Sequence, residues 1–339
     1  MTEFDLIARY FTRPPKRAAL GVGDDCALLN PRPGMQLALS SDMLVEGRHF
    51  FADVDPAALG HKALAVNLSD LAACGATPVA FTLALALPDA DAAWLQGFSN
   101  GLWALADAHG CELIGGDTTQ GPLNICITVI GEVPRGQALL RSGAQAGDDI
   151  YVSGTLGHAR LALQALQGHV KLPPHVLEAM RHRLEQPVPR VALGQALRGV
   201  ASAAIDLSDG LAGDLGHLLK ASGVGAVLNT EALLVLFTSF LIAPKACNTP
   251  ALALFDLKTA ANPLGCVLSG GDDYELAFTA PVQARAAVSA AALHCQTRVS
   301  RIGSIEAAPG LRLLDAHGAS VPNAFGPLTK FASFDHFAS

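Results

Sequence analysis

Short aspartate-containing turns recur along this 339-residue chain, and each follows or interrupts an apolar segment. This pattern constrains the fold, because an apolar segment that runs into Gly, Ser or Asp is typical of a buried strand or helix that ends at a loop. Glycine lets backbone amides approach a ligand closely, and carboxylate oxygens suit Mg²⁺. A Gly-Asp pair can also be an ordinary turn. The clusters are Gly21–Asp25, Ser40–Asp42, Asn67–Asp70, Gly115–Thr118, Asp206–Gly210 and Ser269–Asp273.

Composition and charge distribution narrow the possible functions. Hydrophobic residues make up 50% of the chain and charged residues 16%, which is typical of a well-packed globular protein long enough for two domains. The net charge of -7 argues against nonspecific binding to nucleic acid or to an anionic membrane. From Ala63 to Pro134 the chain has no Lys or Arg. If this region binds phosphate, cations other than side chains must neutralise the charge.

The cysteine pattern and the N-terminal sequence both favour a cytoplasmic protein. The seven cysteines are scattered without a CxxC pair, which predicts reduced thiols, mostly as small core residues. We expect no signal peptide, because the first residues lack a basic segment followed by an apolar one. The apolar run Ala232–Ala243 is too short to span a bilayer and predicts a core or interface element.

The first half of the chain predicts alternating strands and helices. Asp55-Pro56 is a typical helix start and Gly75 a typical stop. A strand over 36–40 is expected to place Ser40, Ser41 and Asp42 at its end. The other expected elements are a short amphipathic helix within 1–20, a strand over 81–87, a helix over 90–109 closed by Gly110 and a strand over 124–133. The apolar pair Leu113-Ile114 leads into the Gly115–Thr118 cluster.

The second half repeats this alternation after a glycine-rich link over 141–147, where we place the domain boundary. The turn Gly154–Gly157 is expected to open a helix through Leu166, and its N-terminus could hold an anion. Residues 168–187 are expected to be a surface connection. The other expected elements are strands over 149–153, 203–205 and 274–278 and helices over 191–200 and 210–221. Two related α/β or α+β domains follow from this order.

Phosphoryl transfer is the chemistry that this set of residues suits. It requires alignment of the attacking oxygen and neutralisation of phosphate charge, usually by Mg²⁺, rather than covalent help from the protein. We expect carboxylates from both halves to converge around Mg²⁺, with Asp70 directed into a cleft, although it could be merely exposed. Ca²⁺ is the rival metal, but scattered ligands suit a metal-nucleotide complex better. The expected ligands are Asp25, Asp42, Asp70, Asp117, Asp206 and Asp209.

The ordered motifs resemble thiamine-monophosphate kinases, which belong to the superfamily of aminoimidazole ribonucleotide synthetase. The resemblance runs from Phe4 to Phe337. It implies a two-domain α/β (α+β) fold of the PurM-like type, with an N-terminal mixed sheet and helices forming a dimeric barrel, followed by a C-terminal α/β domain. The motifs are Gly-Val-Gly-Asp-Asp-Cys-Ala, Ser-Ser-Asp, Ala-Val-Asn-Leu-Ser-Asp-Leu-Ala-Ala, Gly-Gly-Asp-Thr-Thr, Ala-Ile-Asp-Leu-Ser-Asp-Gly-Leu and Ser-Gly-Gly-Asp-Asp-Tyr-Glu-Leu.

The resemblance also implies an activity and a role for each matching residue. The activity is transfer of the γ-phosphate of ATP directly to thiamine monophosphate, which gives thiamine diphosphate and ADP, the last step of thiamine diphosphate biosynthesis. Residues 1–146 would form the ATP- and Mg²⁺-binding and dimerisation domain, and residues 147–339 would complete the site. ATP would be bound through Gly116, Asp117, Arg141 and Ser208, and substrate through His49, Asp272 and Phe331. Several Mg²⁺ ions would be held by Asp25, Ser40, Ser41, Asp42, Asp70, Asp117, Asp206 and Asp209, with catalysis centred on Asp42, Asp70 and Asp209.

This sequence departs from the family pattern at three of these positions. Ser41 stands where threonine is common and keeps the hydroxyl, Asp272 stands where glutamate is frequent, and Phe331 replaces a usual tryptophan. His49 lies beside Phe50 and Phe51 and could instead be a core or edge residue. The alternatives are an ATP-dependent ligase or cyclase of the superfamily, a selenophosphate synthetase, a hydrogenase-maturation protein and a non-catalytic nucleotide-binding protein. The placement of Cys26 and the C-terminal Phe-Ala-Ser disfavour the second and third of these.

Overall fold

The computed structural model describes residues 2–238 and 262–321, so Phe331 and residues 239–257 of the apolar segment 232–257 lie outside the described residues. The chain divides into two compact units. Unit 1 comprises Met1–Ala138 with Glu185–Val191, and unit 2 comprises Leu139–Leu184 with Ala192–Ser339. The chain first passes from unit 1 into unit 2 at Leu139, before the boundary expected at residue 147. The roles expected of the two domains remain predictions.

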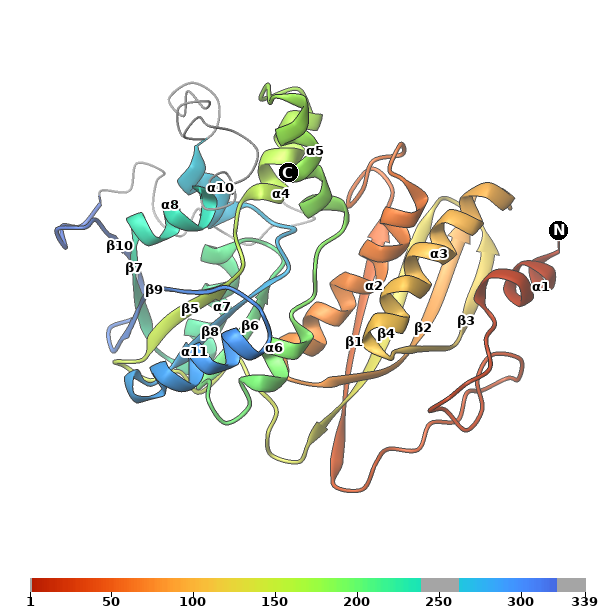
Figure 1. Ribbon diagram of the computed structural model, residues 1–339, viewed down its shortest axis with the longest axis horizontal. Helices are drawn as coiled ribbons and strands as arrows, with labels where there is room; N and C mark the ends of the chain where they lie inside the picture. Colours follow the sequence, from red (N-terminus) through yellow and green to blue (C-terminus); the bar gives the residue numbers. More distant parts are fainter. Residues whose placement is uncertain (1, 239–261, 322–339) are drawn as a thin grey trace. The chain divides into compact units, whose positions relative to one another are not determined.

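Unit 1 is built on a four-stranded mixed sheet, with the helices α2 (Pro56–Ala73) and α3 (Ala92–His109) lying side by side (Figure 1). The strand order is β1-β4-β2-β3, in which only β2 and β3 run parallel. The strands are β1 (Met35–Val45), β2 (Thr77–Leu87), β3 (Glu112–Gln120) and β4 (Asn124–Pro134).

Local sequence explains where α2 and α3 begin and end. The Asp55 carboxylate accepts hydrogen bonds from the N–H groups of Ala57 and Ala58 at 2.9 and 3.0 Å, and Pro56 occupies the first helical position. Asp91 caps α3 in the same way, and Gly110 ends it in the left-handed conformation at φ 59°. The expected boundaries of these two helices are therefore confirmed to within two residues. The helix expected over 191–200 is shorter and ends at Ala196.

Two glycines allow the helices of unit 1 to pack closely. A Cβ on Gly60 would lie 2.0 Å from the carbonyl oxygen of Phe98, and a Cβ on Gly101 would lie 1.8 Å from that of Ala57. Backbone therefore meets backbone where α2 crosses α3. This close approach buries Leu64 and Leu68 of α2 completely.

Unit 2 is a six-stranded mixed sheet with order β10-β7-β9-β5-β8-β6. Its strands are β5 (Asp149–Ser153), β6 (Ala203–Leu207), β7 (Gly225–Asn229), β8 (Glu275–Ala280), β9 (Val299–Glu306) and β10 (Gly310–Leu314). Its helices are α4 (His158–Leu166), α5 (Pro174–Glu185), α6 (Val191–Ala196), α7 (Leu211–Ser222), α8 (Thr230–Thr238), α10 (Pro263–Ser269) and α11 (Arg285–His294). The strands β5 and β8 and the edge strand β6 are buried at every position, and the core continues into α4, α7 and α10.

The structure corrects several expectations about local structure. Ser40, Ser41 and Asp42 lie inside β1 rather than at its end, and residues 115–118 lie inside β3, because both segments pair with neighbouring strands along their whole length. The supposed surface connection 168–187 contains α5, which buries Met180 and Leu184. The N-terminal helix is only α1 (Glu3–Leu6), followed by a π-helical turn, η1 (Ile7–Phe11). Across the described residues, no helix has both the length and the apolar character needed to cross a membrane.

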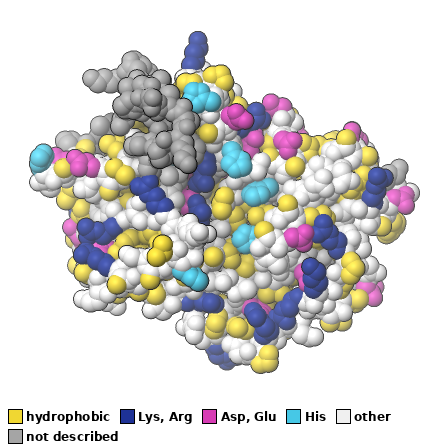
Figure 2. Space-filling view, in the orientation of Figure 1, with side chains coloured by type: hydrophobic (Ala, Val, Ile, Leu, Met, Phe, Trp, Pro, Cys, Tyr) yellow, Lys and Arg dark blue, Asp and Glu magenta, His cyan; other side chains and the backbone are white. Residues whose placement is uncertain are grey.

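On the face shown in Figure 2, acidic and basic side chains are interspersed. Such mixing is typical of ordinary protein surfaces.

Candidate active site

Ser40, Asp42, Asn67 and Asp70 come together in unit 1. The Ser40 hydroxyl donates a hydrogen bond to the Asp70 carboxylate at 2.5 Å, and the Asp42 N–H donates to the Asn67 side-chain oxygen at 3.1 Å. Since alternate residues of a strand face opposite ways, Ser40 and Asp42 share the face of β1 that meets α2. Asn67 and Asp70 share one face of the helix, so the two motifs meet where β1 packs on α2.

Ser41 lies on the opposite face of the same strand. Its hydroxyl is 2.9 Å from the Thr128 hydroxyl and donates to the Ile127 carbonyl oxygen at 3.2 Å. The expected metal ligands of this motif are therefore divided by the pleat of β1, with the side chains of Ser40 and Asp42 toward α2 and that of Ser41 away from it.

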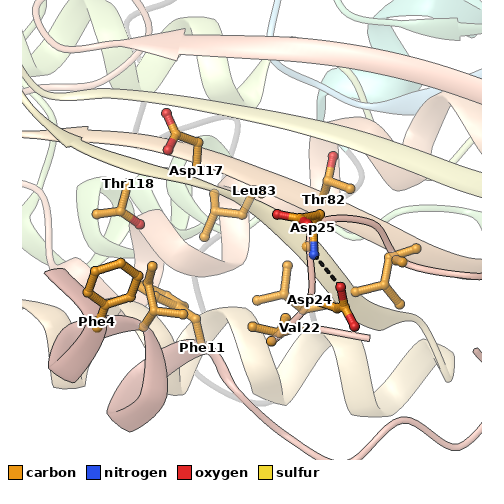
Figure 3. Close-up of a pocket in the computed structure, with 16 residues that line it drawn as sticks. Phe4, Phe11, Val22, Asp24, Asp25, Thr82, Leu83, Asp117 and Thr118 are labelled. Atoms are coloured by element: carbon orange, nitrogen blue, oxygen red, sulfur yellow. Dashed lines mark hydrogen bonds between the residues drawn. The ribbon is translucent and has the colours of Figure 1, made fainter. Parts of the chain in front are cut away.

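A second group of expected residues lines a cavity of about 780 Å³ in unit 1. Asp25, Gly116 and Asp117 form part of its wall, and Figure 3 shows that Asp25 and Asp117 belong to different segments. Phe4 and Phe11 of the N-terminal helical segment supply apolar wall (Figure 3). The cavity thus combines carboxylates with an aromatic surface, a combination that suits a ligand with a charged end and a flat apolar end.

Gly116 allows the close approach of β3 to β2 beside this cavity. Its φ is 146°, and a Cβ there would lie 1.9 Å from the carbonyl oxygen of Leu83. Only glycine fits this position without displacement of the backbone. The residue therefore has a structural requirement in addition to its expected contact with ATP.

His49 follows β1 in a turn. Its Nδ1 accepts a hydrogen bond from the Val45 N–H at 2.9 Å, and the Lys62 ammonium donates to its carbonyl oxygen at 3.2 Å. An accepting Nδ1 places the proton of a neutral ring on Nε2. These contacts hold His49 in one orientation within the turn. The residue is half-buried, so it is not a core residue.

The remaining described candidates lie in unit 2, where β6 runs into α7. Asp206 is buried within β6, while Ser208 and Asp209 are half-buried in the turn that follows. The Asp272 N–H donates to the Ser208 carbonyl oxygen at 2.8 Å, which fixes the two expected ligand-binding motifs of this unit to each other.

Asp214 was not anticipated from the sequence. Its Oδ2 accepts hydrogen bonds from the N–H groups of Asp209 and Gly210 at 3.0 and 3.1 Å, so it holds the backbone of the motif in place. Burial raises the pKa of Asp214 to about 7, and Arg141 opposes this rise. Arg141 is exposed, and its carbonyl oxygen accepts a hydrogen bond from the hydroxyl of Ser222, the last residue of α7, at 3.1 Å. The signal available in the sequence was an acidic residue one turn into the helix that follows Asp209.

The donor set suits magnesium. Within the part of the chain that the structure describes, no three His, Cys, Asp or Glu side chains are grouped as a preformed metal site. Mg²⁺ keeps several waters and is usually bound through one or two carboxylates together with substrate phosphates. The Asp25 and Asp117 carboxylates in the cavity, and the Ser40, Asp42 and Asp70 oxygens where β1 meets α2, are hard donors of the type that Mg²⁺ prefers. The strands β1 and β3, which carry Asp42 and Asp117, lie at opposite edges of the sheet of unit 1.

Comparisons with known proteins identify the family. Residues 23–133 match the family "AIR synthase related protein, N-terminal domain". The thiamine-monophosphate kinase of Salmonella typhimurium is 45% identical over 99% of this chain and 98% of its own length. The crystal structure of the Stenotrophomonas maltophilia K279a enzyme of that name is 42% identical, covers 94% of this chain and 96% of that one, and superposes with a TM-score of 0.79.

A second solved structure contains ligands. It is AaThiL complexed with AMPPCP and TMP, and it is 29% identical with a TM-score of 0.72, covering 91% of this chain and 89% of that chain. These similarities confirm the PurM-like α/β fold expected from the motifs. With 45% identity to a relative over nearly its whole length, this chain belongs to the thiamine-monophosphate kinase family.

Proposed function

We propose that the protein transfers the γ-phosphate of ATP to thiamine monophosphate, forming thiamine diphosphate and ADP. A phosphate oxygen of thiamine monophosphate attacks the γ-phosphorus, and the bond to the β–γ bridging oxygen breaks as ADP leaves. The nucleophilic oxygen is already deprotonated, so no strong general base is required and no phosphoenzyme is formed. Family membership and the complex of AaThiL with AMPPCP and TMP support this reaction.

The observation that carries the proposal is the presence of two groups of hard oxygen donors in unit 1, one where β1 meets α2 and one in the cavity beside β3. Ser40 and Asp70 are hydrogen-bonded beside Asp42, and Asp25 and Asp117 line one cavity, while no Lys or Arg occurs from Ala63 to Pro134. Bound Mg²⁺ would supply the positive charge that offsets the phosphates and the developing charge on the bridging oxygen. The segment from Ala63 to Pro134, which supplies Asp70 and Asp117, therefore offers no cationic side chain of its own to a phosphate.

The chain's own residues would position the nucleotide and the ions. We propose that Asp25, Ser40, Ser41, Asp42, Asp70 and Asp117 of unit 1 and Asp206 and Asp209 of unit 2 hold Mg²⁺. Gly116 presents backbone to ATP, and Ser208 and Arg141 contact it from unit 2. His49 and Asp272 contact thiamine monophosphate, to which Phe331 would add an aromatic surface.

The test is direct. Purified protein is incubated with ATP, Mg²⁺ and thiamine monophosphate, and thiamine diphosphate is separated by chromatography, with ADP measured in parallel. We expect equal amounts of the two products, and none when thiamine replaces thiamine monophosphate, because the alcohol lacks an ionised phosphate oxygen. Absence of thiamine diphosphate from protein that binds AMPPCP would reject the kinase assignment.

We further propose that the protein acts in the cytoplasm as a homodimer that forms through the sheet of unit 1. The face of β1 turned away from α2 exposes three large apolar side chains, Leu37, Leu39 and Met43, at 41%, 62% and 52%. Contiguous exposed apolar surface is typical of a protein interface.

Sedimentation of Leu39→Asp tests this interface. A charge there is expected to shift the protein to monomer. Leu293→Asp on α11, where leucine is 81% exposed, is the matched control and should not change the oligomeric state. An unchanged state in Leu39→Asp would place the interface elsewhere.

A further inference from the structure

The loop between α10 and β8 carries two residues in the left-handed conformation. Asp272 has φ 65° and Tyr274 has φ 48°. Residues other than glycine adopt positive φ at a cost in free energy, and they do so when the surrounding structure holds them there. The loop also contains Asp272, which the proposed function places against thiamine monophosphate.

Backbone contacts hold the loop on either side of Asp273. The Asp272 N–H donates to the Ser208 carbonyl oxygen at 2.8 Å, and the Tyr274 N–H donates to the Leu207 carbonyl oxygen at 2.8 Å. Leu207 is the last residue of β6 and Ser208 follows it, so the loop rests on the end of β6 and the turn after it.

The packing beneath the loop leaves no space for side chains. A Cβ on Gly270 would lie 2.1 Å from the Cys266 carbonyl oxygen, and a Cβ on Gly271 would lie 2.6 Å from the Ser208 carbonyl oxygen. The loop therefore lies close against the end of α10 on one side and against the turn after β6 on the other.

The Asp273 side chain connects the loop to a different element, the N-terminus of α4. Its two carboxylate oxygens accept the Gly157 N–H at 3.1 and 2.9 Å, at the N-terminus of α4. The side chain is buried, with 6% exposure for the residue as a whole. The turn Gly154–Gly157, whose helix N-terminus could hold an anion, thus binds the protein's own Asp273 carboxyl group, and this contact links α4 to the loop. Burial raises the pKa of this carboxyl group well above its ordinary value.

We propose that Asp273 is a positioning residue for substrate binding. Its side chain faces α4 and does not take part in the reaction. By fixing the centre of the loop, it keeps the residue before it in the left-handed conformation and so sets the direction of the Asp272 carboxylate. This inference rests on the proposed function, in which Asp272 contacts thiamine monophosphate.

The test compares Asp273→Ala with Asp273→Asn. Alanine removes both acceptors, and we expect kcat/KM for thiamine monophosphate to fall by about tenfold or more, mainly through KM, because small displacements of a binding group have large effects. Asparagine is nearly isosteric and keeps one acceptor oxygen, so we expect a fall of about two- to fivefold. The Kd of AMPPCP, measured by calorimetry, should stay within about twofold of wild type in both.

The control is Ile302→Ala, which removes a fully buried side chain of β9 in the same core without touching the loop. It should lower stability and leave the KM for thiamine monophosphate unchanged. A KM rise in Ile302→Ala equal to that in Asp273→Ala would refute positioning, since general destabilisation would then explain both. Wild-type KM in a folded Asp273→Ala would refute it as well. If the alanine variant does not fold, the Asp273→Asn variant provides the test, and an unchanged KM for thiamine monophosphate in that variant would refute the positioning role.

A second readout needs no substrate. Hydrogen exchange of the segment 269–276 should be faster in the Asp273 variants than in wild type, and equal rates would refute the inference. If wild-type protein forms no thiamine diphosphate, the proposed function fails, and the exchange rates still decide whether Asp273 holds the loop.

Discussion

Replacing Arg183 by methionine should destabilise unit 2, because the Glu275 carboxylate would remain buried without its cation. The Arg183 guanidinium donates to Glu275 Oε1 at 2.7 Å, and the two side chains are 17% and 1% exposed. Removal of one partner from a buried ion pair costs about 3–5 kcal/mol, since the remaining charge keeps its desolvation penalty. Methionine retains most of the side-chain stem, so the loss reflects charge and hydrogen bonding more than cavity formation.

The expected change is large enough to measure without ambiguity. For a unit of this size, about 3–5 kcal/mol corresponds to a Tm decrease of about 6–20 °C. Trp94 and Trp103 both lie in unit 1, so tryptophan fluorescence reports that unit. Far-UV circular dichroism, combined with hydrogen exchange over β5 and β8, reports the loss in unit 2.

A double variant separates charge from packing. Arg183→Met with Glu275→Gln removes both charges, and the glutamine oxygen can still accept the Ser153 hydroxyl, which donates to Glu275 at 2.6 Å. We expect the double variant to regain at least about half of the lost stability. A Tm decrease under about 2 °C in Arg183→Met would refute the reasoning. The reasoning would also be refuted if the double variant lost as much stability as the Arg183→Met and Glu275→Gln single variants together.

Three further predictions concern packing, pH and catalysis. Gly101→Ala should lower the free energy of unfolding of unit 1 by about 3 kcal/mol, measured by urea titration with tryptophan fluorescence, because its Cβ meets a backbone oxygen of α2. Gly216→Ala, which meets nothing within 4 Å in the middle of α7, should be neutral or stabilising, and equal losses in both would contradict this. Burial lowers the pKa of His158 to about 4, so the unfolded chain takes up the proton first. Wild-type stability should therefore decrease relative to His158→Gln by up to about 3 kcal/mol as pH falls from about 6.5 to about 4, and a pH-independent difference would contradict this. Asp42→Asn and Asp209→Asn should each lower kcat by at least about 100-fold with the Tm nearly unchanged, whereas near-wild-type rates would place the metal site elsewhere.

Helix boundaries could be predicted because their signals are local. Asp55-Pro56 begins α2 and Gly110 ends α3, since capping depends on a side-chain oxygen or a positive φ within one turn. Strand ends were less predictable. Gly115 and Gly116 have low β propensity, yet they lie within β3 because β2 supplies partners along its length.

The amphipathic character of α5 was obscured by its histidines, arginines and flanking prolines. Only packing against the core of unit 2, which buries Met180 and Leu184, reveals it as a helix. The same helix carries Arg183 to Glu275, a contact between residues 92 positions apart. Local patterns contain no information about such a partner.

By itself, the sequence determined the alternation of strands and helices, the supply of oxygen donors and the lack of basic side chains from Ala63 to Pro134. These properties depend on residue type and short spacing. Tertiary structure alone decided which distant residues contact each other. Ser40 bonds to Asp70, 30 residues away, and the Gly157 N–H bonds to Asp273, 116 residues away. The physical reason is that such pairs form only when strand register and helix packing bring distant backbone together, and the free energy for that comes from burying the cores of the two units rather than from the motifs themselves.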